Sequence, residues 1–476
     1  MKPTQKELQH LFLRAGFGLK PTQLQEFEGK KIDKILDIIF KQAENYTNFD
    51  FIKNDEDEIK LKLLPRNEKK VLRKERREEI KMLNIKWLEK MQDNNNQLRE
   101  KMTYFWHTHF ACKSNNAIFN QLQNNTLRKH ALGNFKDLLM AVAKDPAMLQ
   151  FLNNQQNRKE KPNENFAREL MELFTLGRGN YTENDVKNAA RAFTGWGIEK
   201  GEAKFKFREK QHDFSEKKFM GQKGSFSGED ILNIILKKPE TAFFITKKIH
   251  KFFVNDVPNE KILKQLADNF YKSDYDISKL MREIFVADWF YDEKNIGTKI
   301  KSPIELLIGL KRTFELDFVD ENANLFVQKI LGQMLLNPPN VAGWAGGRAF
   351  IDSSSLLFRL QLTQVLFNQA VVEIDNKEEG DDNAQKYNKK NGQPLQATLN
   401  LKNFDVFSEE ESTEKSTEKS NKILAENIKK YLIQDDENLN KTAFEDVLMQ
   451  NLSETKDVFI KQIVLYLTAL PEYQMQ

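Results

Sequence analysis

The sequence has little cysteine: Cys112 is the single cysteine among 476 residues. One cysteine excludes an internal disulfide and any cysteine-rich zinc or iron–sulfur site. The preceding residues, Phe110 and Ala111, are apolar. A buried thiol that packs as a small hydrophobe is therefore preferred to a reactive nucleophile.

The sequence also lacks a long apolar run. No segment approaches the roughly 20 apolar residues of a membrane-spanning helix, and the first residues, Met1 to Glu7, do not have the pattern of a signal peptide. We therefore expect no transmembrane segment and a cytoplasmic location for the chain as written. The alternative is the periplasm or envelope, if a leader was trimmed.

An excess of one charge is missing as well. The 74 basic and 70 acidic residues give a net charge of +4, and the two signs are interspersed, which argues against a nucleic-acid partner. The sequence contains no Gly-x-Ser-x-Gly elbow, phosphate loop or dinucleotide fingerprint. The usual signatures of serine hydrolases, P-loop enzymes and dehydrogenases are thus absent.

Helical periodicity, by contrast, runs through nearly the whole chain, and 36 phenylalanines are available to fill a core. The alternation Phe205-Lys206-Phe207 favours a short strand instead. We predict a mainly α fold, with a compact multi-helix body over 1–374 and a small β-hairpin at about 204–222. Polar residues dominate 375–421, which predicts a flexible insertion. The C-terminal helices over 422–476 are expected to pack back on the main body.

The stretch 162–177 is the most informative segment. Pro162 and Asn163 are start signals for a helix and Gly177 is a stop signal. Helical projection gives this segment an apolar arc and an opposite charged arc. The charged arc consists of Glu164, Arg168, Glu169 and Glu172. Such a face is either a solvated surface or a preorganised polar site, and a buried cluster of ion pairs is preferred to a metal centre.

Two histidines, His107 and His109, are candidate metal ligands because they stand close together in the sequence. On a helix they point about 200° apart, so one of them at most is expected to join the glutamates of 162–177. Imidazole and carboxylate ligands together suit iron, manganese or zinc. The cofactor is therefore unidentified, with a divalent metal as the candidate.

A second candidate pair is His212-Asp213, which could supply a catalytic base and its partner. The alternative is a loop turn capped by Asp213. Three tryptophans, Trp106, Trp196 and Trp344, could line a sugar-binding cleft, but a place in the core is preferred for such large rings.

Seven segments together resemble one known family. They are HLFLRAGFG at 10–18, FWHTHF at 105–110, NENFARELMELFTLG at 163–177, AFTGW at 192–196, HD at 212–213, KSPIE at 301–305 and PPNVAGW at 338–344. The chain resembles the bacterial domain-of-unknown-function 1800 family over about 5–370 and the terminal helix. The resemblance implies no particular reaction. It implies a sulfatase-like partner encoded nearby, and an exported protein, from which this chain departs by lacking a signal pattern.

Two functional hypotheses follow. The first is an envelope- or polysaccharide-related enzyme, in which the polar residues of 162–177 converge with the histidine motifs on one pocket. The second is a non-catalytic scaffold or accessory protein acting with the sulfatase-like partner.

Overall fold

The computed structural model describes residues 1–53, 65–93, 95–199, 202–369, 395–408, 417–437 and 439–476. In these ranges the chain is mainly α-helical, and the strands form three two-stranded antiparallel sheets. The predicted fold class is confirmed. No helix of the described ranges is long and apolar enough to cross a membrane.

The helices of the first half are α1 (Gln5–Ala15), α2 (Pro21–Phe27), α3 (Ile32–Glu44), α5 (Arg66–Gln92), α6 (Gln97–His109), α7 (Ala117–His130), α8 (Phe135–Ala143), α9 (Pro146–Phe151), α10 (Asn165–Glu169) and α11 (Glu183–Ala192). Those of the second half are α12 (Gly228–Leu236), α13 (Pro239–Phe253), α14 (Glu260–Lys272), α15 (Ile277–Val286), α16 (Pro303–Thr313), α17 (Ala323–Ile330), α18 (Ser353–Phe367), α20 (Thr417–Leu432), α21 (Lys441–Asn451) and α22 (Lys456–Thr468). The strands are β1 (Trp196–Ile198), β2 (Phe205–Phe207), β3 (Lys217–Phe219), β4 (Gln222–Gly224), β5 (Asp317–Phe318) and β6 (Ala397–Thr398).

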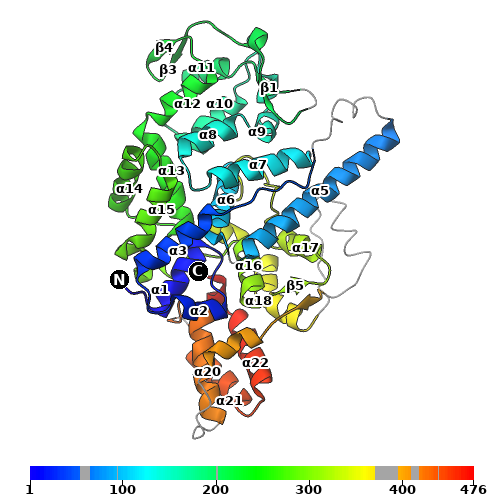
Figure 1. Ribbon diagram of the computed structural model, residues 1–476, viewed down its shortest axis with the longest axis vertical. Helices are drawn as coiled ribbons and strands as arrows, with labels where there is room; N and C mark the ends of the chain where they lie inside the picture. The colour runs from blue at the N-terminus through cyan, green and yellow to red at the C-terminus, as the bar shows by residue number, and fades with distance from the viewer. Residues whose placement is uncertain (54–64, 94, 200–201, 370–394, 409–416, 438) are drawn as a thin grey trace.

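The helices form an elongated body (Figure 1). Helices α10 to α12 and the strands β1, β3 and β4 lie at one end, α6 and α7 lie in the middle, and α20 to α22 lie at the opposite end. Helix α20 contacts α1, and α22 contacts α18. One hydrophobic cluster extends from Leu8 to Tyr473 and joins these parts.

The region of the predicted hairpin contains two small sheets rather than one. Strand β2 pairs with β1, which precedes the predicted range, and β3 pairs with β4. The β3–β4 turn is Met220-Gly221, and both residues have positive φ, 49° and 84°. Such a two-residue turn usually contains Asn-Gly or Asp-Gly. Methionine at the first position removed the usual sequence signal.

The predicted polar insertion, 375–421, is ordered in part. Residues 395–408 carry β6 and a 3₁₀ turn, Lys402–Phe407. Leu395, Ala397 and Phe404 in this segment are buried against the main body. Helix α20 begins at Thr417, inside the predicted insertion. Within the predicted insertion, residues 395–408 are thus held against the body, because apolar side chains recur at intervals in this polar segment. Residues 375–394 and 409–416 lie outside the described residues.

The core contains the rings and the thiol that the sequence placed there. Trp106 and Trp196 are 0% and 1% exposed, and Cys112 is buried. Trp344 is half-buried, with its ring 5.6 Å from that of His107. For Trp106 and Trp196 the core interpretation is confirmed.

Charged side chains also join distant helices inside the core. Arg128 of α7 binds Glu100 of α6 through both carboxylate oxygens, at 2.7 and 3.1 Å. Lys101 of α6 lies 2.6 Å from Glu305 of α16, and both side chains are buried. Buried charges require such partners, because the desolvation of an isolated ion in the interior costs on the order of several kcal/mol of stability.

Candidate functional site

The segment 162–177 starts as predicted but changes its helical type halfway. The side chain of Asn163 accepts a hydrogen bond from the Asn165 amide at 3.0 Å, and α10 follows. From Leu170 to Thr175 the helix is a π-helix. The amides of Leu176 and Gly177 both donate to the Met171 carbonyl. The chain then leaves the helix at Gly177, with φ +78°. The stop is confirmed, whereas a continuous α-helix is wrong.

Arg168 is the centre of a surface ion-pair network. Its guanidinium lies 3.2 Å from Glu164 and 2.6 Å from Glu183 at the start of α11. The exposed fractions of the Arg168 and Glu164 side chains are 34% and 38%. Hydrogen bonds from Arg168 to Glu183 raise the pKa of Arg168. These contacts fit the ion-pair interpretation of the charged arc, at the surface rather than in the interior.

Glu172 has a separate set of partners in the loop that follows. Its carboxylate accepts hydrogen bonds from Arg178 at 2.6 Å and from the Tyr181 hydroxyl at 2.9 Å. The hydrogen bond from Arg178 is the main cause that lowers the pKa of Glu172. Burial, together with the Glu172 charge, raises the pKa of Tyr181 to about 12. Glu172 is therefore held as a carboxylate.

Glu169 differs from its neighbours in the arc. Among the described residues, no hydrogen bond or ion pair satisfies its carboxylate, although the side chain is only partly exposed. Burial raises its pKa, and the negative charge of Glu172 adds to the increase. Two nearby carboxylates thus have pKa values displaced in opposite directions, an arrangement typical of acid–base sites.

His212 and Asp213 make separate contacts. His212 is 4% exposed, and its Nδ1 donates to the Thr194 carbonyl at 2.8 Å. The carboxylate of Asp213 binds Arg191 at 2.7 Å and accepts the Ser215 amide at 2.9 Å. Burial would raise the pKa of Asp213, but these hydrogen bonds outweigh it and lower the pKa to about 2. Asp213 is therefore a permanent carboxylate whose charge is directed to Arg191.

Helix α11 carries one partner of the charged arc and one partner of the His212-Asp213 pair; we call these two groups the polar clusters. Glu183, which binds Arg168, is its first residue, and Arg191, which binds Asp213, lies near its end. The two positions are eight residues apart, which corresponds to about 12 Å of helix. The structure thus brings the charged arc and the His212-Asp213 pair to one helix, but to opposite ends of it.

His107 and His109 point to different elements, as their spacing predicted. Nε2 of His107 accepts the Leu336 amide at 3.2 Å, whereas Nε2 of His109 donates to the Phe174 carbonyl at 3.1 Å. Burial lowers the pKa of each imidazole to about 3. The described residues contain no group of three or more side chains placed to hold a metal ion. A metal at these histidines stays a prediction, which elemental analysis of the purified protein tests.

The partners of the charged arc were missed at the sequence level. Arg178 and Tyr181 lie in a loop, and Glu183 lies on the next helix, so no helical projection groups them with 162–177. One signal was present: Thr182 and Asp185 form a capping box, which fixes Glu183 in the first turn of α11.

With this geometry in place, comparison with known proteins gives one match. The family described as a protein of unknown function, DUF1800, matches residues 10–475. The chain belongs to the DUF1800 family. No curated protein and no solved structure matches it. The charged arc, His212-Asp213 and both histidines of α6 all lie within the part matched by DUF1800.

Proposed function

We propose that this DUF1800 protein is an acid–base enzyme acting on a polysaccharide, with Glu169 as the general acid. The observation that carries the proposal is that Glu169 has no partner in the described residues, while Glu164, Arg168 and Glu172 are all ion-paired. A carboxylic acid that donates a proton near neutral pH needs a raised pKa. Glu169 has one, caused first by burial.

The second carboxylate of the proposed site is Glu172. Glycoside hydrolysis commonly uses two carboxyl groups, one protonated and one ionised. In this scheme Glu169 protonates the leaving oxygen as the glycosidic bond breaks, and Glu172, held ionised by Arg178 and Tyr181, stabilises the positive charge that develops on the sugar. Water then adds to the anomeric carbon and returns a proton to Glu169. The scheme needs no metal, and Arg168, which is ion-paired with Glu164 and Glu183, holds the charged arc to the start of α11.

A polymer laid along α11 would reach both polar clusters, since they lie about 12 Å apart. Asp213 and Arg191 at the far end of α11 would then contact a neighbouring unit of the chain. His212 supports this end of the site through its hydrogen bond to Thr194.

The test is hydrolysis of a panel of bacterial envelope polysaccharides, followed by the release of reducing ends. Glu169→Gln keeps the shape of the side chain and removes its proton donor, so the rate should fall about 10²–10⁴-fold. Glu160→Gln is the matched control, because Glu160 is an exposed carboxylate just before the same helix. Equal rates for wild type and Glu169→Gln on a hydrolysed substrate would end the proposal.

A non-catalytic accessory role is the second candidate, and helix α5 favours it. The buried residues of α5 begin at Leu83, so the preceding half extends from the body (Figure 1). That half exposes Val71 and Met82, at 56% and 52%, among charged side chains. Mixing the protein with the sulfatase-like protein encoded nearby should then give a common peak in size-exclusion chromatography. Replacing Val71 and Met82 by Ser should separate the two proteins.

A further inference from the structure

A pocket of about 230 Å³ lies between the N-terminal helices and α6, with Arg312 of α16 in its wall. At about 30 Å³ for each water molecule, this volume equals that of roughly eight waters. The pocket belongs to α1, α2, α3 and their neighbours, at some distance from α10 and α11 in the body (Figure 1).

The floor of the pocket is apolar. Phe12 and Phe27 have their ring centroids 4.7 Å apart, and Ile39 and Leu98 continue the same surface. Their exposed fractions are between 1% and 8%. A small ligand with one apolar face can therefore rest on this floor without leaving a polar group unpaired.

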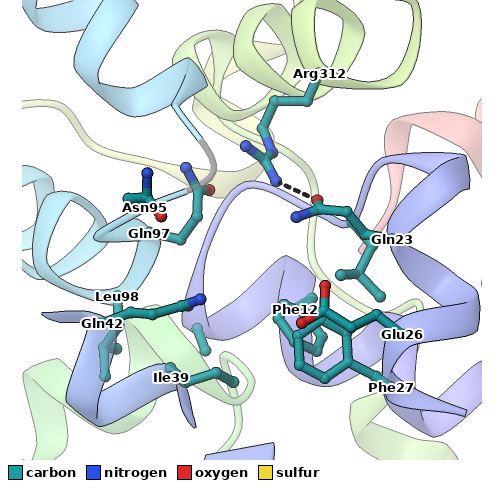
Figure 2. A pocket seen from close by; sticks show the side chains of 12 residues that line it. Phe12, Gln23, Glu26, Phe27, Ile39, Gln42, Asn95, Gln97, Leu98 and Arg312 are labelled. Carbon is teal, nitrogen blue, oxygen red and sulfur yellow. Dashed lines mark hydrogen bonds between the residues drawn. The ribbon is translucent and has the colours of Figure 1, made fainter.

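The rim carries hydrogen-bonding groups that are free to act. Figure 2 shows Glu26 and Gln42 on opposite sides, with their polar ends directed into the pocket. Asn95 lies on the same side as Gln42. Within the described residues, the side chains of Glu26, Gln42 and Asn95 make no hydrogen bond or ion pair. Two amides and one carboxylate offer both donors and acceptors, as a ligand with several hydroxyl groups requires.

The guanidinium of Arg312 lies in the pocket wall but is not available to bind an anionic ligand. Its Nε donates to the Gly18 carbonyl at 2.9 Å and its Nη1 to the Gln92 carbonyl at 2.8 Å. Its Nη2 donates to Gln23 at 3.2 Å, the bond drawn in Figure 2. The guanidinium is thus used to hold the wall together, and Glu26 is left as the ionised group that faces a ligand.

We propose that this pocket binds a single sugar ring that is neutral or carries an amino group. An apolar floor with a few converging polar groups is the usual composition of a small-molecule site. A hexose fits because it combines an apolar ring face with a rim of hydroxyl groups. Glu26 excludes acidic sugars by like-charge repulsion and favours an amine through a charge-assisted hydrogen bond.

The experiment is a titration of the purified full chain with glucosamine, glucose and glucuronate, followed by saturation-transfer NMR. We expect dissociation constants on the order of 1 mM for glucosamine and glucose, given the small size of the ligands, and binding of glucuronate at least tenfold weaker. The measurement is made at equilibrium without turnover. Its outcome is therefore separate from that of the proposed acid–base function.

Reversal of one charge gives the decisive variant. Glu26→Lys changes an exposed residue, so the fold should persist, and it should reverse the preference from glucosamine to glucuronate. Glu28→Lys makes the same change at an exposed position outside the pocket and should leave the wild-type order intact. Gln42→Met should weaken glucose binding about tenfold by removing one hydrogen-bonding amide. The proposal is overturned if no sugar binds, if glucuronate binds wild type as tightly as glucosamine, or if Glu26→Lys leaves the order unchanged.

Discussion

Replacement of Glu305 by glutamine should strongly destabilise the protein. Glu305 is 7% exposed and accepts from the buried Lys101 at 2.6 Å. Burial lowers the pKa of Arg14, Lys301 and Arg359 nearby, and the Glu305 carboxylate opposes that decrease at all three. Glutamine keeps the size of the side chain and can still form the capping box with Ser302. The variant therefore removes the charge alone.

Two routes give the same magnitude for Glu305→Gln. Burial would raise the pKa of Glu305, but Lys101 and further hydrogen bonds lower it from 4.5 to about 2. At about 1.4 kcal/mol for each pKa unit, this difference corresponds to about 3 kcal/mol of stability. Removing one partner of a buried ion pair independently costs about 3–5 kcal/mol. Because the folded-state pKa is the lower one, this stability is present above pH 4.5 and is lost as the pH falls toward 2.

Urea unfolding at pH 7 measures the loss. Glu78→Gln is the control, since Glu78 forms an exposed pair with Lys81, with exposed fractions of 55% and 43%. An exposed pair of this kind contributes about 0–1 kcal/mol. A loss below about 1 kcal/mol for Glu305→Gln, or one no larger than that of Glu78→Gln, would refute the reasoning, because the buried cations would then not depend on this carboxylate.

Three further predictions concern other positions. Burial raises the pKa of Asp145 to about 7, so its contribution is complete below pH 4 and is lost as the pH rises toward 7. Asn at this position keeps the helix cap and should raise the unfolding free energy by up to about 4 kcal/mol at pH 8, but not at pH 4, in urea titrations. Gly195→Ala should lower the unfolding free energy by about 1–3 kcal/mol, since the added Cβ would lie 2.7 Å from a carbonyl oxygen at φ +81°. Gly179→Ala, at φ +88° with nothing within 4 Å of the added Cβ, should lower it less when both variants are unfolded in urea. His109→Leu leaves the Phe174 carbonyl without its partner and should cost about 1–3 kcal/mol, with faster amide exchange in 170–177.

The helical parts of the fold could be predicted because their signals are local. Thr182 and Ser302 cap α11 and α16 with an acidic residue three positions later, a pattern that is readable in any sequence. The ordered segment 395–408 could not be predicted, because its stability comes from contacts with distant helices. Phe404, for example, stacks on Phe314 of the main body, and no local sequence pattern predicts that contact.

The candidate site shows the same division. The charged arc was predictable from helical projection, and so was the divergence of His107 and His109. The π-helix Leu170–Thr175 could not be predicted, because the wider helical turn depends on contacts with other elements and not on the local sequence. In the structure, each residue of the π-helix advances less around the axis than α-helical projection assumes. The direction of Glu172 therefore differs from the projection, and its carboxylate accepts a hydrogen bond from Arg178.

The segments that characterise the family meet one another in the structure. His107 and Thr108 of α6 contact Leu336 and Gly343 of the 331–347 loop; a Cβ on Gly343, at φ +74°, would lie 2.6 Å from the Thr108 carbonyl. His109 of the same turn donates to the Phe174 carbonyl in the π-helix. The end of α6 thus holds a loop and the π-helix at once, through hydrogen bonds between its two buried imidazoles and their backbones.

The buried contacts of the π-helix Leu170–Thr175 lie apart from the charged side chains of 162–177. A π-helix is less favourable than an α-helix and persists where its surroundings hold it. Here the Thr175 hydroxyl donates to the Leu170 carbonyl at 2.6 Å, and His109 binds Phe174 on the opposite, buried side. The helix held in this way carries Glu172, which is paired with Arg178, and Glu169, which has no partner among the described residues. If Glu169 is the proposed general acid, these buried contacts are the rigid scaffold that keeps it in place.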